Sequence, residues 1–226
     1  MKGVMIMENR VLVIFPHPDD EAFGVSGTIA LYTEKGIPVT YVCCTLGEMG
    51  RNMGNPPIAT RESLPFIRKK ELLNATKAVG IEDLRMLGLR DKTLEFEDLD
   101  ELADRFRGFI DELKPSLVIT FYPGYSVHPD HEATGYAVIQ AVKQMPEAAR
   151  PKLHCVAFSN DCYERLGEPD VVVDITAVQD KKIACILAHE TQAAGFMEDF
   201  PEKLKRKDPD ILPWLNTERF WTYTFD

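Results

Sequence analysis

Two short segments contain most of the side chains that could do chemistry. The segment "PHPDDE", residues 16–21, brings together one imidazole and three carboxylates, those of His17, Asp19, Asp20 and Glu21. The segment "HPDH", residues 128–131, adds His128, Asp130 and His131. Carboxylates crowded together without cations raise one another's pKa and cost stability, and a divalent cation removes that cost. Two imidazoles and one carboxylate suit zinc and leave a fourth position for water, which is the catalytic arrangement.

Each segment also has an ordinary structural explanation. Acidic residues at the start of a helix are favoured by the helix dipole, and "HPDH" alone could be a solvated turn. A dinucleotide site is a further alternative, because "PHPDDEAFGVSG" follows an apolar run and Glu48 could take the place of the acid that binds ribose. The G-x-G-x-x-G pattern is absent, however, and carboxylates stand where pyrophosphate would dock. The two segments together therefore favour a metal site.

The pattern of apolar residues predicts how these segments are positioned. Strands are expected at 10–15, 39–45, 83–89, 117–122, 152–159 and 171–176, and helices at 22–36, 66–80, 99–115, 132–145 and 177–192. The tail that follows is left unassigned. This alternation predicts an α/β fold of three layers (α/β/α), with a Rossmann-like, doubly wound and mostly parallel sheet in the order 3-2-1-4-5 plus a later strand. "PHPDDE" and "HPDH" then follow neighbouring strands at the point where the winding reverses, which is where ligands bind.

Length, charge and cysteine content narrow the class of protein. The 226 residues are enough for one domain, 1–226. The formal charge of −10 argues against a nucleic-acid binder and disfavours docking on anionic membranes. No apolar stretch reaches the ~20 residues that span a bilayer. The apolar run within the first ten residues, "MKGVMIMENR", is too short for a secretory signal. Five cysteines without a CxxC pair indicate a reduced, cytoplasmic protein.

The paired motifs resemble those of a known family. "PHPDDE" after a strand, with "HPDH" about one hundred residues later, is similar to the zinc-dependent deacetylases of the LmbE/PIG-L family, over residues 10 to about 192. "TLGEMG", an R-x-x-E helix and "AHETQ" also match, whereas Pro16 stands where the family commonly has alanine or glycine. "GEMGRNMG" followed by "PFIRKKEL" resembles the bacillithiol-biosynthesis deacetylases, which remove acetate from N-acetylglucosaminyl malate.

The resemblance implies roles for individual residues. It implies that zinc is bound by His17, Asp20 and His131, although the same ligands also suit ferrous iron. Asp19 would then be the general base. His128 would stabilise the oxyanion, with Asp130 holding it oriented and charged.

The resemblance also implies a small N-acetyl sugar substrate and an oligomer of identical chains. Candidate substrate-binding residues are Arg68, Glu48, Tyr125 and Arg51. His189 and Gln192 could line the pocket or be ordinary helix residues, and His154 is expected in the core. Two other functions stay open: an amidase acting on thiol-sugar S-conjugates, and a non-catalytic metal- or ligand-binding module.

Overall fold

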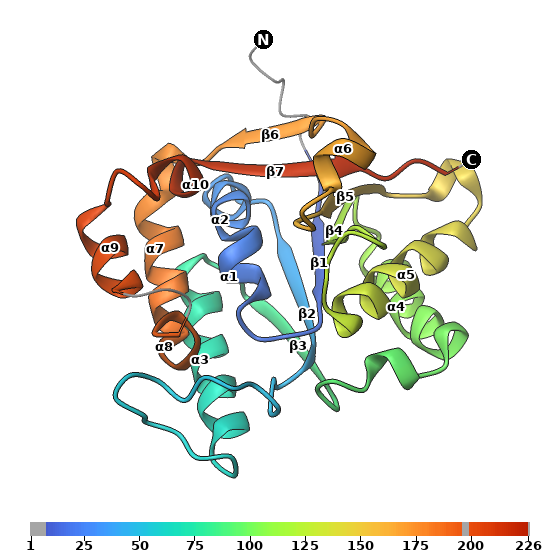
Figure 1. The fold of residues 1–226 in the computed structure, drawn as a ribbon. Coiled ribbons are helices and arrows are strands. Elements are labelled where there is room, and N and C mark those ends of the chain that lie inside the picture. Colours follow the sequence, from blue (N-terminus) through green and yellow to red (C-terminus); the bar gives the residue numbers. More distant parts are fainter. Residues whose placement is uncertain (1–7, 196–198, 226) are drawn as a thin grey trace.

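The computed structural model describes residues 8–195 and 199–225, and a seven-stranded sheet runs through its centre (Figure 1). The strand order is β3-β2-β1-β4-β5-β7-β6, which confirms the predicted doubly wound α/β fold. The strands are β1 Val11–Phe15, β2 Val39–Thr45, β3 Asp83–Leu89, β4 Leu117–Phe121, β5 Lys152–Val156, β6 Val171–Asp174 and β7 Thr217–Thr222. β1 to β5 are parallel, whereas β7 is antiparallel to both β5 and β6.

The central strands form because their apolar runs can be buried on both faces at once. Every residue of β1, β2 and β4 is buried, as expected for parallel strands covered by helices on both sides. One face packs against α1 Asp20–Gly24, α2 Ser26–Glu34, α3 Leu64–Ala78 and α7 Gln179–Ala188. The other packs against α4 Leu99–Leu113 and α5 Pro129–Lys143 (Figure 1). The shorter helices are α6 Cys162–Leu166, α8 Glu190–Ala193, α9 Phe200–Arg206 and α10 Leu212–Asn216.

Several segments differ from the sequence-based prediction. The strand expected at 152–159 ends at Val156, and the helix expected at 177–192 is divided at His189 into α7 and α8. The helix expected at 22–36 is interrupted at Val25, where the backbone φ of −144° separates α1 from α2. The unassigned tail contains β7, which inserts between β5 and β6 and pairs with β5 through His154↔Thr222 and Cys155↔Trp221. The later strand expected at 171–176, β6, is therefore joined to the sheet only through β7.

The winding reverses between β1 and β4, which pair directly through Val11↔Leu117 and the two following positions. The turn after β1 and the start of α5 consequently meet at the carboxyl edge of the sheet.

All five cysteines are buried and none is in a disulfide. No helix in the described part of the chain has both the length and the apolar character needed to cross a bilayer. Residues 1–7, on which the expectation about a secretory signal partly rests, lie outside the described residues.

Candidate metal centre and active site

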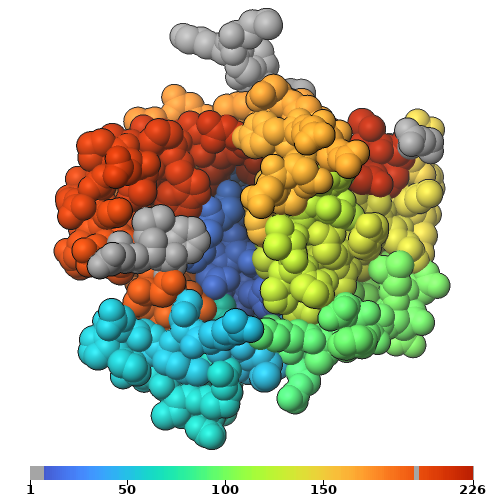
Figure 2. All heavy atoms as spheres, in the orientation of Figure 1, coloured from blue at the N-terminus to red at the C-terminus, as the bar shows by residue number. Residues whose placement is uncertain are grey.

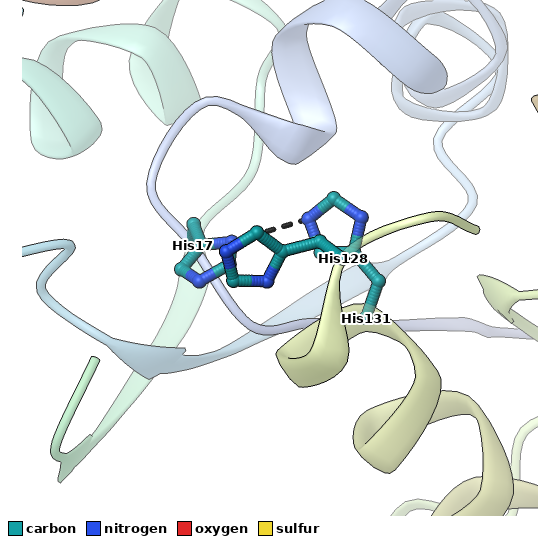
Figure 3. Close-up of side chains that lie close together, drawn as sticks. All are labelled: His17, His128 and His131. Carbon is teal, nitrogen blue, oxygen red and sulfur yellow. Dashed lines mark hydrogen bonds between the residues drawn. The ribbon is translucent and has the colours of Figure 1, made fainter. Parts of the chain in front are cut away.

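Three histidine side chains from the two motifs face one another at the switch point (Figure 3). His17 follows β1, while His128 and His131 come from the start of α5. The His17 Nδ1 and His131 Nε2 atoms are 3.2 Å apart. The Asp20 carboxylate lies between them, with one oxygen 3.5 Å from His17 Nδ1 and the other 3.3 Å from His131 Nε2. The predicted convergence of the two distant motifs is therefore present in the structure.

These separations match the donor spacing of a tetrahedral zinc site. Bonds of about 2.0–2.1 Å to zinc place two ligand atoms of a tetrahedron about 3.3–3.4 Å apart. Burial alone would raise the pKa of Asp20, but His131 and His17 together hold it well below its usual value. His17, Asp20 and His131 thus present one carboxylate and two imidazole nitrogens to a common point, and this donor set fits a divalent cation.

The ring nitrogens of His17 and His131 that point away from the proposed metal position also have protein partners. His17 Nε2 lies 3.1 Å from Asp130 and 3.1 Å from Asp91, while His131 Nδ1 lies 3.1 Å from the Ser126 carbonyl oxygen. The His131 ring also stacks on Phe121, with 4.1 Å between centroids. A carboxylate or carbonyl that accepts one ring N–H directs the lone pair of the other nitrogen toward a metal. Both rings are therefore oriented for ligation.

Two other clusters also bring possible ligands together, His17 with His128 and His131, and His17 with Asp91 and Asp130. The second cluster is poorly suited to a metal because its oxygens are already occupied. The Asp130 carboxylate accepts hydrogen bonds from the backbone N–H groups of Lys92 (2.7 Å) and Leu94 (3.1 Å) as well as contacting His17. Asp91 accepts one from the Met49 N–H at 2.7 Å. These carboxylates orient His17 rather than compete for the ion.

The position of Asp130 corrects one sequence-based expectation. Its carboxylate was expected to orient His128 and keep it charged, but it contacts His17 instead. The link to His128 is made by the backbone: the Asp130 N–H donates to His128 Nδ1 at 3.1 Å. Because Nδ1 accepts a hydrogen bond, the ring proton of neutral His128 is on Nε2. Burial lowers the pKa of His128, as do His17 and His131, so the structure favours a neutral donor.

Asp19 adopts an unusual backbone conformation at the entry to α1. Its φ of 125° is rare for a residue with a side chain, and strain of this kind costs about 1–3 kcal/mol and is typical of functional sites. Arg68 lies 3.0 Å from the Asp19 carboxylate and also donates to the Pro18 and Gly47 carbonyls. Burial raises the pKa of Asp19 to about 6, with Arg68 opposing the rise. Arg68 lies so close over Gly47 (φ +60°) that any side chain there would collide with it.

A second buried pair supports the same turn. Glu21 and His189 are fully buried, and His189 Nε2 lies 2.6 Å from Glu21 Oε1. The other oxygen of Glu21 accepts hydrogen bonds from the Asp19 backbone N–H and the Tyr41 hydroxyl. Burial works against a charged His189, but Glu21 raises the pKa of His189 above its usual value. His189 thus belongs to the support of Asp19, and the sequence left its role open.

Three of the four predicted substrate-binding residues contact other protein groups, and the fourth, Arg51, is exposed. Glu48 accepts a hydrogen bond from the Asp91 N–H at 3.0 Å. Tyr125 packs against Tyr122 with 5.6 Å between ring centroids, and Arg51 is exposed in the loop after β2. Arg68 is 3% exposed, and its guanidinium contacts protein groups on the pocket wall. Their roles toward a substrate stay predictions.

A pocket of about 740 Å³ opens in front of the histidine cluster. Figure 2 shows it as a hollow whose floor is the blue segment around α1, with the cyan loop after β2 on one side and residues of the yellow-green segment on another. Gln192, from the "AHETQ" segment, lines it together with Asn52 of that loop. Aromatic residues form much of the remaining wall: Phe23, Phe121, Phe158, Tyr163, Trp214 and Trp221.

Comparison with known proteins identifies the family. The family model described as PIG-L, GlcNAc-PI de-N-acetylase, matches residues 12–142. The chain belongs to the PIG-L family. The expected resemblance to these de-N-acetylases is therefore confirmed.

Individual relatives cover nearly the whole chain. A Bacillus cereus protein named "Probable N-acetyl-alpha-D-glucosaminyl L-malate deacetylase 2" is 54% identical over 97% of this chain and 100% of its own length, and a Bacillus subtilis protein of the same name matches equally well. Among solved structures, the N,N'-diacetylchitobiose deacetylase from Pyrococcus horikoshii has a TM-score of 0.74 at 25% identity. That match covers 96% of this chain and 84% of the other.

Sequence reasoning missed several residues of this PIG-L site. Asp91 follows β3 alone and outside any motif, so no local pattern pointed to it. The "R-x-x-E" and "AHETQ" motifs did carry a signal, because Glu71 accepts hydrogen bonds from the Thr191 backbone N–H and hydroxyl, both at 2.7 Å. These two motifs join α3 to α8 behind the pocket.

Proposed function

We propose that this chain is a metal-dependent deacetylase that hydrolyses the acetamide of N-acetylglucosaminyl malate. The observation that carries the proposal is the convergence of His17 Nδ1, His131 Nε2 and the Asp20 carboxylate beside Asp19, at one end of a pocket large enough for a substituted sugar. Relatives that are 54% identical over nearly the whole chain are named as deacetylases of this malate conjugate.

We assign His17, Asp20 and His131 as the ligands of a divalent cation, either zinc or ferrous iron. When bound, such an ion polarises a carbonyl oxygen and lowers the pKa of water toward neutrality. Asp91, Asp130 and the Ser126 carbonyl keep the two imidazoles in the orientation that this requires. The identity of the ion, a cytoplasmic location and an oligomeric state stay predictions.

The chain's own residues provide the proton transfers. Asp19, with a pKa raised to about 6 by burial, is suited to take a proton from the attacking water and to return it to the departing amine. Arg68 and Glu21 hold its carboxylate and its backbone in place. His128 presents its Nε2–H as a donor to the acetamide oxygen, which becomes an oxyanion when water adds to the carbonyl carbon.

The test is acetate release from N-acetylglucosaminyl malate by the metal-free protein and by protein loaded with Zn²⁺ or Fe²⁺. We expect turnover only with metal, and a kcat about 10²- to 10⁴-fold lower in the Asp19→Asn variant, which still binds metal. Asp104→Asn, an exposed acid on α4, is the matched control and should behave as the parent protein. Failure of metal-loaded protein to release acetate from this substrate would refute the proposal. Amine release from a thiol-sugar S-conjugate would favour the amidase instead.

A further inference from the structure

The pocket extends well beyond the metal-binding residues, toward β7. Because β7 is antiparallel to β5, with Thr222 opposite His154 and Trp221 opposite Cys155, residues 217–219 run past the carboxyl end of β5 at Val156. Thr217, Glu218 and Arg219 line the far wall of the pocket, together with Trp221 of the same strand. In the sheet order, β7 lies on one side of β1 and β4, whereas β3 and the Asp91 segment lie on the other.

Most charges along this pocket are neutralised by protein partners. Arg68 is paired with Asp19 at 3.0 Å. Lys182 and Glu218, both buried, pair at 2.9 Å, and the ammonium of Lys182 also lies over the Trp214 ring at 4.5 Å.

The Glu218 carboxylate is satisfied further by backbone donors. It accepts hydrogen bonds from the N–H groups of Gly27 (2.9 Å) and Thr28 (2.7 Å) at the start of α2. The charge of Glu218 is therefore compensated locally, which reduces its repulsion of an anion bound at the neighbouring residue on β7.

Two cationic side chains in the pocket are left over. Lys92 and Arg219 both line it and are exposed, and within residues 8–195 and 199–225 neither side chain has an ion-pair or hydrogen-bond partner. The lining of the pocket has four acids (Asp19, Asp20, Asp91 and Glu218) and four cations (Arg68, Lys92, Lys182 and Arg219), so Lys92 and Arg219 are notable for their lack of a partner among the described residues and not for a net positive charge. A ligand with a negatively charged group could pair with one of these two cations.

The positions of these two cations differ. Lys92 follows Asp91, and its backbone donates to Asp130, so it stands beside the residues that orient His17. Arg219 lies at the other end, next to an aromatic wall in which Tyr163 and Trp221 meet edge to face with 5.5 Å between centroids. Because Phe121, Phe158, Tyr163 and Trp221 line the same pocket, a sugar with its acetamide at the metal-binding end would have its ring beside aromatic side chains and its substituent directed toward β7.

We propose that Arg219 anchors an anion subsite, with Trp221 and Tyr163 as its wall, that binds a carboxylate of the group attached to the sugar. The inference rests on the proposed function and deepens it by assigning the part of the pocket that recognises the acidic aglycone. A guanidinium suits this task because its fork of N–H donors matches a carboxylate. The subsite selects for substrates that carry a negative charge away from the acetamide.

The test compares two substrates with the same sugar, the malate conjugate and its uncharged dimethyl ester. In Arg219→Gln we expect kcat/KM for the dianion to fall about 10- to 100-fold, mostly through KM, since the loss is that of a charge-assisted hydrogen bond. The ester should change less than about threefold, which is a small fraction of that loss. Arg165→Gln, an exposed arginine on α6 outside the pocket, is the matched control and should change neither.

Binding gives a readout that does not depend on turnover. In an Asp19→Asn background, calorimetric titration with the malate conjugate should show a Kd raised by a similar factor when Arg219 is also replaced. A loss confined to the dianion in Lys92→Gln but not in Arg219→Gln would overturn the inference and move the subsite to the metal-binding end. Equal losses on both substrates in Arg219→Gln would overturn it as well. Failure of the parent protein to cleave either substrate would instead refute the proposed function.

Discussion

Arg68 offers the sharpest test of how the site is held together, because its two interpretations predict different kinetics. As a substrate-binding residue, Arg68 would contribute mainly to KM. In the structure it is 3% exposed, and its guanidinium joins Asp19 and Pro18 after β1 to Gly47 after β2. We therefore expect Arg68→Gln to act mainly on kcat, through the position of the Asp19 carboxylate.

The size of the effect follows from the contacts. The bond to Asp19 joins two charged groups, and the loss of such a bond costs about 1.5–3 kcal/mol. If that loss falls on the transition state, kcat drops about 10- to 100-fold. The same substitution leaves a mostly buried carboxylate and two carbonyls without their donor, so the free energy of unfolding should fall by about 3–5 kcal/mol. Arg68→Lys should recover only part of either loss, because one ammonium cannot reach all three acceptors as a planar fork does.

Steady-state kinetics on metal-loaded protein distinguish the positioning role of Arg68 from a substrate-binding role. Metal content and urea unfolding are measured in parallel. Lys70→Gln, an exposed cation two residues further along α3, is the matched control and should leave all three quantities unchanged. A variant Arg68→Gln that keeps the parent kcat while KM rises would refute the positioning role and restore the substrate-binding one.

Three further predictions concern single side chains. Asp19→Asn should keep its metal but lose about 10²- to 10⁴-fold in kcat, the usual contribution of a general base; metal analysis with initial rates tests this, and parent-level turnover would contradict it. Lys182→Met should lower the free energy of unfolding by about 3 kcal/mol, because Glu218 stays buried without its cation; urea denaturation tests this, and a change under 1 kcal/mol would contradict it. Arg85→Gln should lower Tm more at pH 7 than at pH 2.5. Although burial alone would raise the pKa of Asp83, Arg85 holds it below its usual value, so the stabilisation is present at neutral pH and lost as the pH falls through that lowered pKa. An equal loss of Tm at both pH values would contradict this.

The fold was predictable where one local pattern decides the structure. β1, β2 and β4 are short runs of apolar, β-rich sequence buried on both faces, and their order follows from right-handed crossovers. β7 was missed because its sequence, TERFWT, does not alternate cleanly between polar and apolar residues. Glu218 occupies a buried position there, made tolerable by Lys182 and the start of α2, which are far away in the chain. A pattern within one strand cannot reveal a partner of that kind.

The site was predictable to the same extent. The ligand positions lie in two compact motifs, and the topology of the sheet brings them together. The supporting residues are scattered: Asp91 comes from a loop after β3, and His189 is 168 residues away from the Glu21 side chain that it contacts. Such contacts depend on tertiary packing, so only a recognised motif such as "AHETQ" can hint at them beforehand.

The structure also changes the reason for expecting a metal. Crowded carboxylates alone do not require a dication here, because most have a partner of their own: Asp19 has Arg68, Glu21 has His189, and Asp130 has two backbone N–H groups. Asp20 is different. One of its oxygens accepts a hydrogen bond from the His17 backbone N–H, and the other lies 3.3 Å from His131 Nε2. Without a metal, the charge of Asp20 is offset chiefly by protonated His131 and His17, the two imidazoles that would give their nitrogens to the ion. The demand for a cation is therefore concentrated at one carboxylate and two oriented nitrogens. This predicts that replacing Asp20 abolishes metal binding, whereas replacing Asp19 does not.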